Sequence, residues 1–310
     1  MASLVSSTIV CSAGNNQARR RRGDKNMKIG AVMFFTSYSM GPAALGRALE
    51  ERGFESLWVP EHSHIPSSRK SEYPAGGPLI RPYYDIMDPF LLLNTAAAVT
   101  TQLKIGTGVC LINQRDPIHT AKLVSSIDQL SNGRFLFGVG NGWNQDEMEN
   151  HGTEFLSRHK LSRERIEAMQ AIWTQDEPEY HGEMVNFDKM KQWPKPVQTP
   201  YPPVIVGGAF PYAARRAIRY GNGWIPRADR LEKDGVGVLV AQFRRTATEA
   251  GRDPASLPIT IFRVPDDIQK LRYCAEIDID RVVFSLPPEP ADKILPILDR
   301  WVAVRRELHG

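Results

Sequence analysis

Short apolar runs alternate along the chain with longer stretches in which apolar positions recur every three or four residues. The short runs predict strands buried on both faces, and the longer stretches predict helices that cover them. The predicted strands are Lys28–Phe34, Ser56–Val59, Leu103–Val109, Phe135–Val139, Val204–Val206, Gly223–Ile225, Ile259–Phe262 and Arg281–Ser285. The predicted helices are Gly41–Arg52, Asp88–Thr100, Pro117–Leu130, Arg163–Trp173, Tyr212–Tyr220, Leu231–Ala250, Asp266–Glu276 and Ala291–Leu308.

Strict alternation of strand and helix favours an α/β fold with a parallel sheet. Eight such units after residue 26 fit a (β/α)8 TIM barrel, which typically needs about 250 residues. A doubly wound sheet is the alternative, although it would need fewer strands and two halves. Residues 178–203 interrupt the rhythm with several prolines and a hairpin predicted over Glu179–Phe187. We expect this segment to be an insertion between helix 4 and strand 5.

Residues 1–26 differ in composition from the remainder and carry Arg19, Arg20, Arg21, Arg22 and Lys25 against the single acid Asp24. The tail therefore accounts for the whole formal net charge of +4, and the body is neutral. A neutral body argues against nucleic-acid binding by the fold. We predict a disordered or non-native extension, with Met27 as the alternative start, and a single barrel domain over 27–310.

The cysteines indicate the cellular compartment, and the hydropathy indicates whether the chain spans a membrane. Cys11, Cys110 and Cys274 are few, odd in number and far apart, which argues against a disulfide framework and favours a reducing, cytoplasmic location. No apolar stretch approaches the roughly 18 residues of a membrane span. A small molecule is therefore the expected partner.

Glycine gathers at the carboxyl ends of three predicted strands. The runs are Gly106-Thr107-Gly108-Val109, Gly140-Asn141-Gly142-Trp143 and Gly207-Gly208. In a parallel barrel all of these ends lie on one face, where active sites are found. Each run alone is compatible with a plain βα turn, but their recurrence predicts a cleft that holds a flat ligand against the backbone.

Glu61-His62 is an acid–histidine pair at the end of the second predicted strand. A histidine there can exchange a proton with a reacting ligand near neutral pH. His64 and His119 lie near loops and are weaker candidates. No cluster of histidine, cysteine and acidic residues has the spacing of a metal site, and no serine elbow is present.

Gly207-Gly208-Ala209 precedes a predicted helix that begins near Tyr212. The free N–H groups at a helix N-terminus attract anions, and small residues let a phosphate approach. The motif therefore predicts a phosphate site, although a tight βα turn would have the same sequence.

These motifs together resemble the bacterial luciferase-like superfamily of flavin and deazaflavin oxidoreductases, and its coenzyme F420-dependent branch most of all. The resemblance covers essentially all of 27–310. The matching segments are Trp58–His62, Gly106–Val109, Pro117–Lys122, Asp128–Arg134, Gly138–Trp143, Lys195–Pro200, Val206–Gly208 and Gly221–Trp224.

The resemblance implies a TIM barrel that holds an isoalloxazine-like ring at its C-terminal face, and members of the family commonly form homodimers. It implies a non-prolyl cis peptide at Gly108–Val109 behind the ring, and it places Glu61 and His62 at the ring edge and the reacting face. The residues that it assigns to cofactor binding are Thr107, Gly108, Val109, Gly140, Asn141, Gly142, Arg158, Gly207, Gly208 and Ala209.

One residue departs from the branch. Its sugar-phosphate dehydrogenases have a glutamate after the Gly-x-Gly of strand four, where this chain has Trp143. An aromatic side chain there argues against sugar-phosphate oxidation and favours a flatter or more apolar substrate. Tyr83, Tyr84 and Trp193 are further candidates for an aromatic wall, with core or rim positions as the alternative.

The implied function is hydride transfer between coenzyme F420 and an unsaturated or carbonyl compound, with His62 as proton donor or acceptor. An FMN-dependent monooxygenase that uses reduced flavin and oxygen is the first alternative. A non-catalytic barrel subunit is the second.

Overall fold

Eight parallel strands form the centre of the fold in the computed structural model, which describes residues 27–231 and 235–309. They are β1 (Lys28–Met33), β2 (Ser56–Val59), β3 (Lys104–Thr107), β5 (Phe135–Gly140), β8 (Val204–Gly207), β9 (Gly223–Ile225), β10 (Thr260–Phe262) and β11 (Arg281–Leu286). Neighbours in this order pair in parallel, and β11 returns to pair with β1. The bridges Trp224–Ile259 and Arg227–Phe262 connect β9 to β10. The predicted TIM barrel is confirmed.

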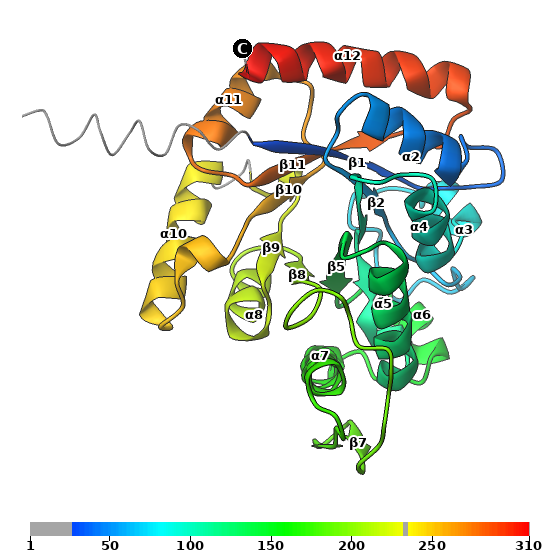
Figure 1. Ribbon diagram of the computed structural model, residues 1–310, viewed down its shortest axis with the longest axis vertical. Coiled ribbons are helices and arrows are strands. Elements are labelled where there is room, and N and C mark those ends of the chain that lie inside the picture. Colours follow the sequence, from blue (N-terminus) through cyan, green and yellow to red (C-terminus); the bar gives the residue numbers. More distant parts are fainter. Residues whose placement is uncertain (1–26, 232–234, 310) are drawn as a thin grey trace, which may run out of the picture.

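Eight longer helices surround the strands, as Figure 1 shows. They are α2 (Pro42–Glu51), α4 (Pro89–Ala97), α5 (Pro117–Leu130), α7 (Arg158–Thr174), α8 (Tyr212–Tyr220), α10 (Val236–Glu249), α11 (Ile268–Glu276) and α12 (Ala291–His309). Asp88 and Asp116 cap α4 and α5, since their carboxylates accept from the first free N–H groups of each helix. None of the helices within the described ranges is long and apolar enough to span a membrane.

Apolar side chains fill the inside of the barrel. They are Val32, Trp58, Leu136, Ile205, Ile225, Phe262 and Val283, all buried, with Val109 packed against them. A larger cluster lies between the strands and the helices. Because the interior is packed, a ligand can bind only at an end of the barrel.

The insertion lies beside α7. Strands β6 (Tyr180–His181) and β7 (Asn186–Phe187) form the predicted antiparallel hairpin. Tyr180 and Phe187 pack against Leu161 and Ala168 of α7, and Figure 1 shows the hairpin beyond that helix. The hairpin therefore extends the wall of the barrel.

Two predicted elements end differently in the structure. The strand predicted over Leu103–Val109 stops at Thr107, where a cis Gly108–Val109 peptide turns the chain toward the short β4 (Cys110–Leu111) and η1 (Ile112–Gln114). The helix predicted over Leu231–Ala250 begins later, as α10 at Val236, because Gly235 has φ +82° and is not helical; the short α9 (Ala228–Leu231) ends at the first residue of the predicted range. Residues 232–234 and the predicted 1–26 extension lie outside the described residues.

Besides η1 and α9, further short helices were absent from the sequence prediction. They are α3 (Pro82–Asp85), α6 (Gln145–Asn150) and η2 (Pro254–Ser256). The helix predicted over Arg163–Trp173 is also longer and starts at Arg158. Helices α3 and α6 lie in the loops after β2 and β5, so both belong to the face where the candidate site is expected.

Candidate active site

His62 follows β2 and pairs with an acid that the sequence did not single out. Its Nδ1 lies 2.8 Å from Oε2 of Glu147, on α6. The side chains are 6% and 1% exposed, so the pair is almost fully removed from water. The other carboxylate oxygen of Glu147 accepts from the backbone N–H of Ser63 at 3.1 Å. Glu147 therefore fixes both the ring of His62 and the backbone that follows it.

A carboxylate only accepts hydrogen bonds, so this contact assigns the proton of the neutral His62 ring to Nδ1. Nε2 is then the nitrogen that remains for a ligand. A buried histidine with one nitrogen held by a carboxylate and the other available is the usual arrangement of a proton-transfer group.

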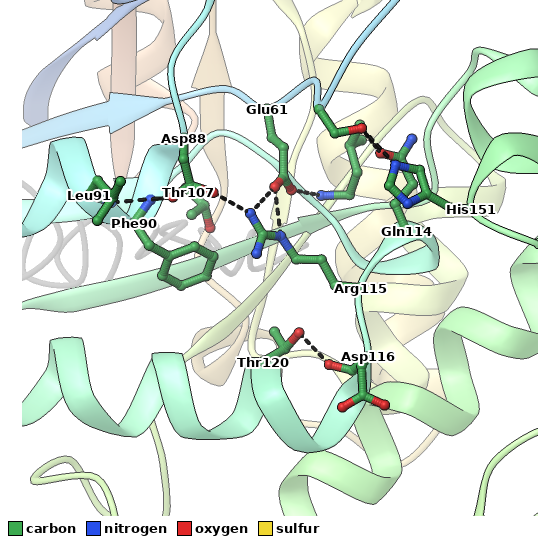
Figure 2. A network of polar contacts seen from close by, with 12 residues as sticks. Glu61, Asp88, Phe90, Leu91, Thr107, Gln114, Arg115, Asp116, Thr120 and His151 are labelled. Carbon is green, nitrogen blue, oxygen red and sulfur yellow. Dashed lines mark hydrogen bonds and ion pairs between the residues drawn. The ribbon is translucent and has the colours of Figure 1, made fainter.

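Glu61, the neighbour of His62, has a different set of contacts. One oxygen accepts from the Leu111 N–H at 2.6 Å, and the other accepts from Arg115 Nε at 2.6 Å. Arg115 also reaches Asp88 at 2.8 Å, and Figure 2 shows its guanidinium between the two carboxylates. Burial by itself lowers the pKa of Arg115, but Glu61 outweighs it and raises that pKa above its usual value. Both Glu61 oxygens are thus engaged, which favours a structural role over the predicted catalytic one.

Two aromatic rings lie beside His62, and a third packs against both of them. Its ring centroid is 5.1 Å from Tyr83 and 5.9 Å from Trp143, and Tyr73 lies 5.3 Å from Tyr83 and 6.0 Å from Trp143. Burial and the hydrogen bond with Tyr73 raise the pKa of Tyr83 to about 12, so its phenol keeps its proton at neutral pH. This aromatic cluster of Tyr73, Tyr83 and Trp143 forms a wall of mutually inclined rings beside the histidine.

The other two predicted wall residues lie elsewhere. Tyr84 is 50% exposed and accepts a hydrogen bond from Arg69 at 2.8 Å. Trp193 is 57% exposed and contacts the ammonium group of Lys195, 5.1 Å from the ring centre. Both belong to the rim or the surface, the alternative that the sequence had left open.

The side chain of Val109 accounts for the presence of glycine at two of the positions predicted to bind the cofactor. A Cβ on Gly140 would lie 2.3 Å from Cγ2 of Val109, and a Cβ on Gly207 would lie 2.8 Å from its Cγ1. The glycines at the ends of β5 and β8 therefore leave room for the Val109 side chain, which the cis peptide directs over the barrel. The ends of the strands are shaped by this side chain and are not simply bare backbone.

Thr107 and Asn141 continue this floor with polar groups. Thr107 Oγ1 donates to the Gly138 carbonyl at 2.7 Å, so its hydroxyl joins β3 to β5. Asn141 accepts through its backbone oxygen from Asn113 Nδ2 at 2.9 Å. Its side-chain nitrogen is buried and has no partner within the described residues. The same is true of Asn144, so two amide donors remain for a ligand.

A cluster of two arginines, Arg158 and Arg216, with the neutral His159 lies beside Gly208. A Cβ on Gly208 would be 3.7 Å from Nη2 of Arg216. Arg158 stacks 3.7 Å over Phe155, and its Nε and that of Arg216 are buried without a hydrogen-bond partner in the part that the structure describes. Partial desolvation of the His159 ring, whose residue is exposed overall, and then the charges of Arg216 and Arg158 lower the pKa of His159 to about 4.

These observations fit an aromatic cofactor that carries phosphate. The cations and the N-terminus of α8, with Gly207, Gly208 and Ala209 before it, suit an anion. The unpaired Asn141 amide suits the polar edge of a ring, because a buried donor without an acceptor is costly. Gly142 and Trp143 border the same floor. Within the described ranges, no group of three or more potential ligands is arranged to hold a metal ion.

Glu147 is the candidate site residue that the sequence did not indicate, and a local pattern could have found its helix. Asn144 and Glu147 have the Asn-x-x-Glu spacing of a helix start, and the Asn144 side chain accepts from the Glu147 N–H at 3.5 Å. Nothing local indicates the contact with His62, which lies 85 residues earlier.

Comparisons with known proteins agree with this architecture. Residues 42–265 match the luciferase-like monooxygenase family. The uncharacterized protein Rv0953c of Mycobacterium tuberculosis is 38% identical over 287 residues, which cover 89% of this chain and 98% of that protein. The crystal structure of monooxygenase RslO1 from Streptomyces bottropensis has a TM-score of 0.71 at 18% identity and covers 92% of this chain and 100% of its own, which shows the fold.

Two more distant relatives bear names that state a cofactor. The F420-dependent hydroxymycolic acid dehydrogenase of Mycobacterium tuberculosis is 28% identical over 221 residues, 69% of this chain and 55% of that protein. The FMNH(2)-dependent dimethylsulfone monooxygenase of Pseudomonas putida is 31% identical over 157 residues, 50% of this chain and 42% of that protein. The chain is thus a member of the luciferase-like monooxygenase family, whose oxidoreductases include both F420-dependent and FMN-dependent enzymes.

Proposed function

We propose that this protein transfers a hydride between coenzyme F420 and a small unsaturated or carbonyl compound, with His62 donating or accepting the accompanying proton. The buried His62–Glu147 pair beside the aromatic cluster carries the proposal. Similarity to an F420-dependent dehydrogenase supports the choice of cofactor.

When bound, the deazaflavin ring would supply a carbon that carries the hydride, and the protein positions the reactants around it. Val109 would support the ring from the barrel side. Asn141 would offer its amide nitrogen to the polar edge of the ring, and Arg158 and Arg216 would bind the phosphate.

The substrate would lie against Trp143 and Tyr83, with its reacting atom toward Nε2 of His62. Glu147 holds Nδ1 and stabilises the positive charge of the ring when Nε2 gains a proton. Glu61 positions His62 through the backbone, because its own carboxylate is held by Arg115 and Leu111. Exclusion of water from the pair strengthens each of these interactions.

The decisive experiment replaces His62 by alanine. Oxidation of reduced F420 is followed without oxygen against enones, imines and aldehydes. We expect turnover to fall by about 10²- to 10⁴-fold, the usual range for a general acid or base, while the cofactor dissociation constant is unchanged. His119→Ala is the matched control, since that side chain is 90% exposed. Equal losses of turnover and of cofactor binding in His62→Ala would contradict the proposed role.

Glu147→Gln tests the partner of His62. The amide keeps the size of the side chain but removes the negative charge, so we expect kcat to fall by roughly 10- to 100-fold with KM little changed. Glu149→Gln changes the same charge on the same helix and should retain activity, because its carboxylate pairs with Lys70 at the surface. Similar rates in both variants would remove Glu147 from the mechanism.

An FMN-dependent monooxygenase is the second candidate, favoured by the relative that uses reduced flavin. Titration with F420 and with FMN, read by quenching of the protein's tryptophan fluorescence, separates the two. We expect F420 to saturate at the lower concentration. Tighter binding of FMN, with consumption of oxygen by the reduced complex, would establish the alternative.

A further inference from the structure

Arginine side chains gather across the barrel mouth from His62. Arg227 follows β9 and Arg263 follows β10, and a bridge between Arg227 and Phe262 holds the two strand ends side by side. Arg230 lies one turn further along. The contacts already described use none of these three cations.

The acid that lies among them neutralises only one. Asp229 accepts from Arg227 Nε at 2.9 Å and from Arg227 Nη2 at 2.6 Å, so both of its oxygens are occupied. Arg230 donates to the Pro74 carbonyl, a neutral acceptor. Arg263 interacts with Asp229 through charge and does not form an ion pair with it in the described structure. This edge of the mouth therefore carries surplus positive charge.

The backbone of Arg263 is in the left-handed region, with φ +61°. A long side chain there costs free energy that glycine would avoid, and such residues gather at ligand-binding sites. Its strand neighbours Ile261 and Phe262 are buried, whereas Arg263 itself is partly exposed at the end of the strand.

Tyr83 connects Arg263 to the proton-transfer group. Its ring lies 5.1 Å from that of His62, and its phenol is close enough to the Arg263 guanidinium to interact with its charge. Arg263 is partly exposed, and a guanidinium has five donors, of which Tyr83 can engage at most one. The remaining donors are available to a ligand that lies on the aromatic cluster.

We propose that Arg263 binds the carboxylate of the substrate, and that the site takes a flat, unsaturated organic acid whose far end lies at His62. Arginine binds carboxylates through two parallel hydrogen bonds, which fix direction as well as affinity. The aromatic cluster supplies the surface for the flat part. The identity of the reacting end rests on the proposed function, whereas the binding of an acid does not.

Isothermal titration of trans-cinnamate and trans-cinnamamide tests this directly, because the two differ in the carboxylate alone. Both are titrated into the cofactor-free chain and into the chain saturated with the cofactor that binds. The variants are Arg263→Gln, Arg263→Gly and Arg263→Lys. Arg272→Gln is the matched control, since Arg272 pairs with Glu307 on the exposed helix surface. FMN and riboflavin differ in the phosphate, so the ratio of their affinities shows whether Arg263 binds the cofactor phosphate instead.

We expect cinnamate to bind the original chain and Arg272→Gln about tenfold more tightly than the amide, as for a charge-assisted hydrogen bond. Arg263→Gln and Arg263→Gly should abolish the preference, Arg263→Lys should retain part of it, and the ratio of FMN to riboflavin affinity should stay constant. Arg263→Gly should unfold at the same or a higher temperature, since glycine accepts this φ.

Three results would overturn the proposal. The first is an equal affinity of the original chain for acid and amide. The second is an unchanged preference in Arg263→Gln. The third is a lower FMN-to-riboflavin ratio in that variant, which would assign Arg263 to the cofactor. Turnover of F420 is not part of this measurement, so a failure of the redox proposal would be distinguishable.

Discussion

At the residue scale, the close approach of Val109 to two glycines constrains the site. The side chain occupies the space that a Cβ on Gly140 or Gly207 would need. The valine thus sets the shape of the floor, and the glycines on the neighbouring strands accommodate it.

We predict that Gly140→Ala lowers the free energy of unfolding by about 1 to 3 kcal/mol, the usual cost of overpacking. Val109→Ala in the same chain should recover part of this loss, because it removes both methyl groups. Urea denaturation of the two single variants and the double variant measures the coupling. Additive effects would show that Gly140 is required for another reason.

His159 makes stability depend on acidity. Its pKa is about 4 when folded against an ordinary 6.5, so the unfolded chain binds the extra proton between these values. Stability should therefore fall as the pH drops from about 6.5 to about 4. His159→Gln should flatten that part of the profile, and sulfate should stabilise the original chain by neutralising Arg158 and Arg216. Thermal unfolding at stepped pH, with the exposed His181→Gln as control, measures this.

At the element scale, the short helix α6 organises the loop over residues 63–87. Asp146 accepts from Ser68 Oγ and from the Lys70 N–H, both at 2.7 Å. Lys70 also pairs with Glu149. Contacts from one helix thus hold the start of the loop over the site.

Asp146→Ala should release this segment. We expect amide hydrogen exchange over residues 66–72 to accelerate, while exchange in the barrel strands stays unchanged, because the lost bonds are local. Ser68→Ala removes one of the two bonds and should show an intermediate effect. Uniform acceleration across the chain would instead indicate global destabilisation.

The strands and long helices followed from the sequence because each carries its own signal. A strand such as β5 is buried along its whole length and is therefore an unbroken apolar run. Helix α6 is short and mostly polar, so no periodicity revealed it. The turn after Thr107 contains a cis peptide. The family resemblance implied that bond, whereas the apolar pattern alone predicted that the strand continues to Val109.

The site was predictable in its place and only partly in its contacts. His62, Trp143 and the glycines lie at the predicted face, since strand order fixes which ends converge. The pairing of His62 with Glu147 and of Glu61 with Arg115 joins residues far apart in sequence. Glu61 and His62 are adjacent in the sequence, and nothing in that motif indicates that each has a different partner.

At the scale of the whole molecule, the candidate site lies at one end of the barrel and a buried ion pair lies at the other. The end opposite the site holds Arg281, which donates to both oxygens of Glu55 at 2.7 and 2.6 Å. The Arg281 side chain is 6% exposed. This buried pair joins the start of β11 to the residue before β2.

Glu55→Gln should lower the free energy of unfolding by about 3 kcal/mol, because it leaves Arg281 buried without its counter-charge. Cofactor affinity should be unchanged at the other end. Asp299→Asn, which removes an exposed pair with Arg52, should cost less than about 1 kcal/mol. Chemical denaturation and cofactor titration of both variants test the separation of stability from binding.

Asp146 and Glu147 are consecutive, yet one anchors the loop and the other orients the histidine. In the proposed mechanism, a shift of this single helical turn would disturb substrate access and proton transfer together. Variants selected for bulkier substrates should therefore fall into two groups. Those that enlarge the entrance to the site by moving α6 should lose rate, whereas those that shorten the loop beyond Lys70 should keep it.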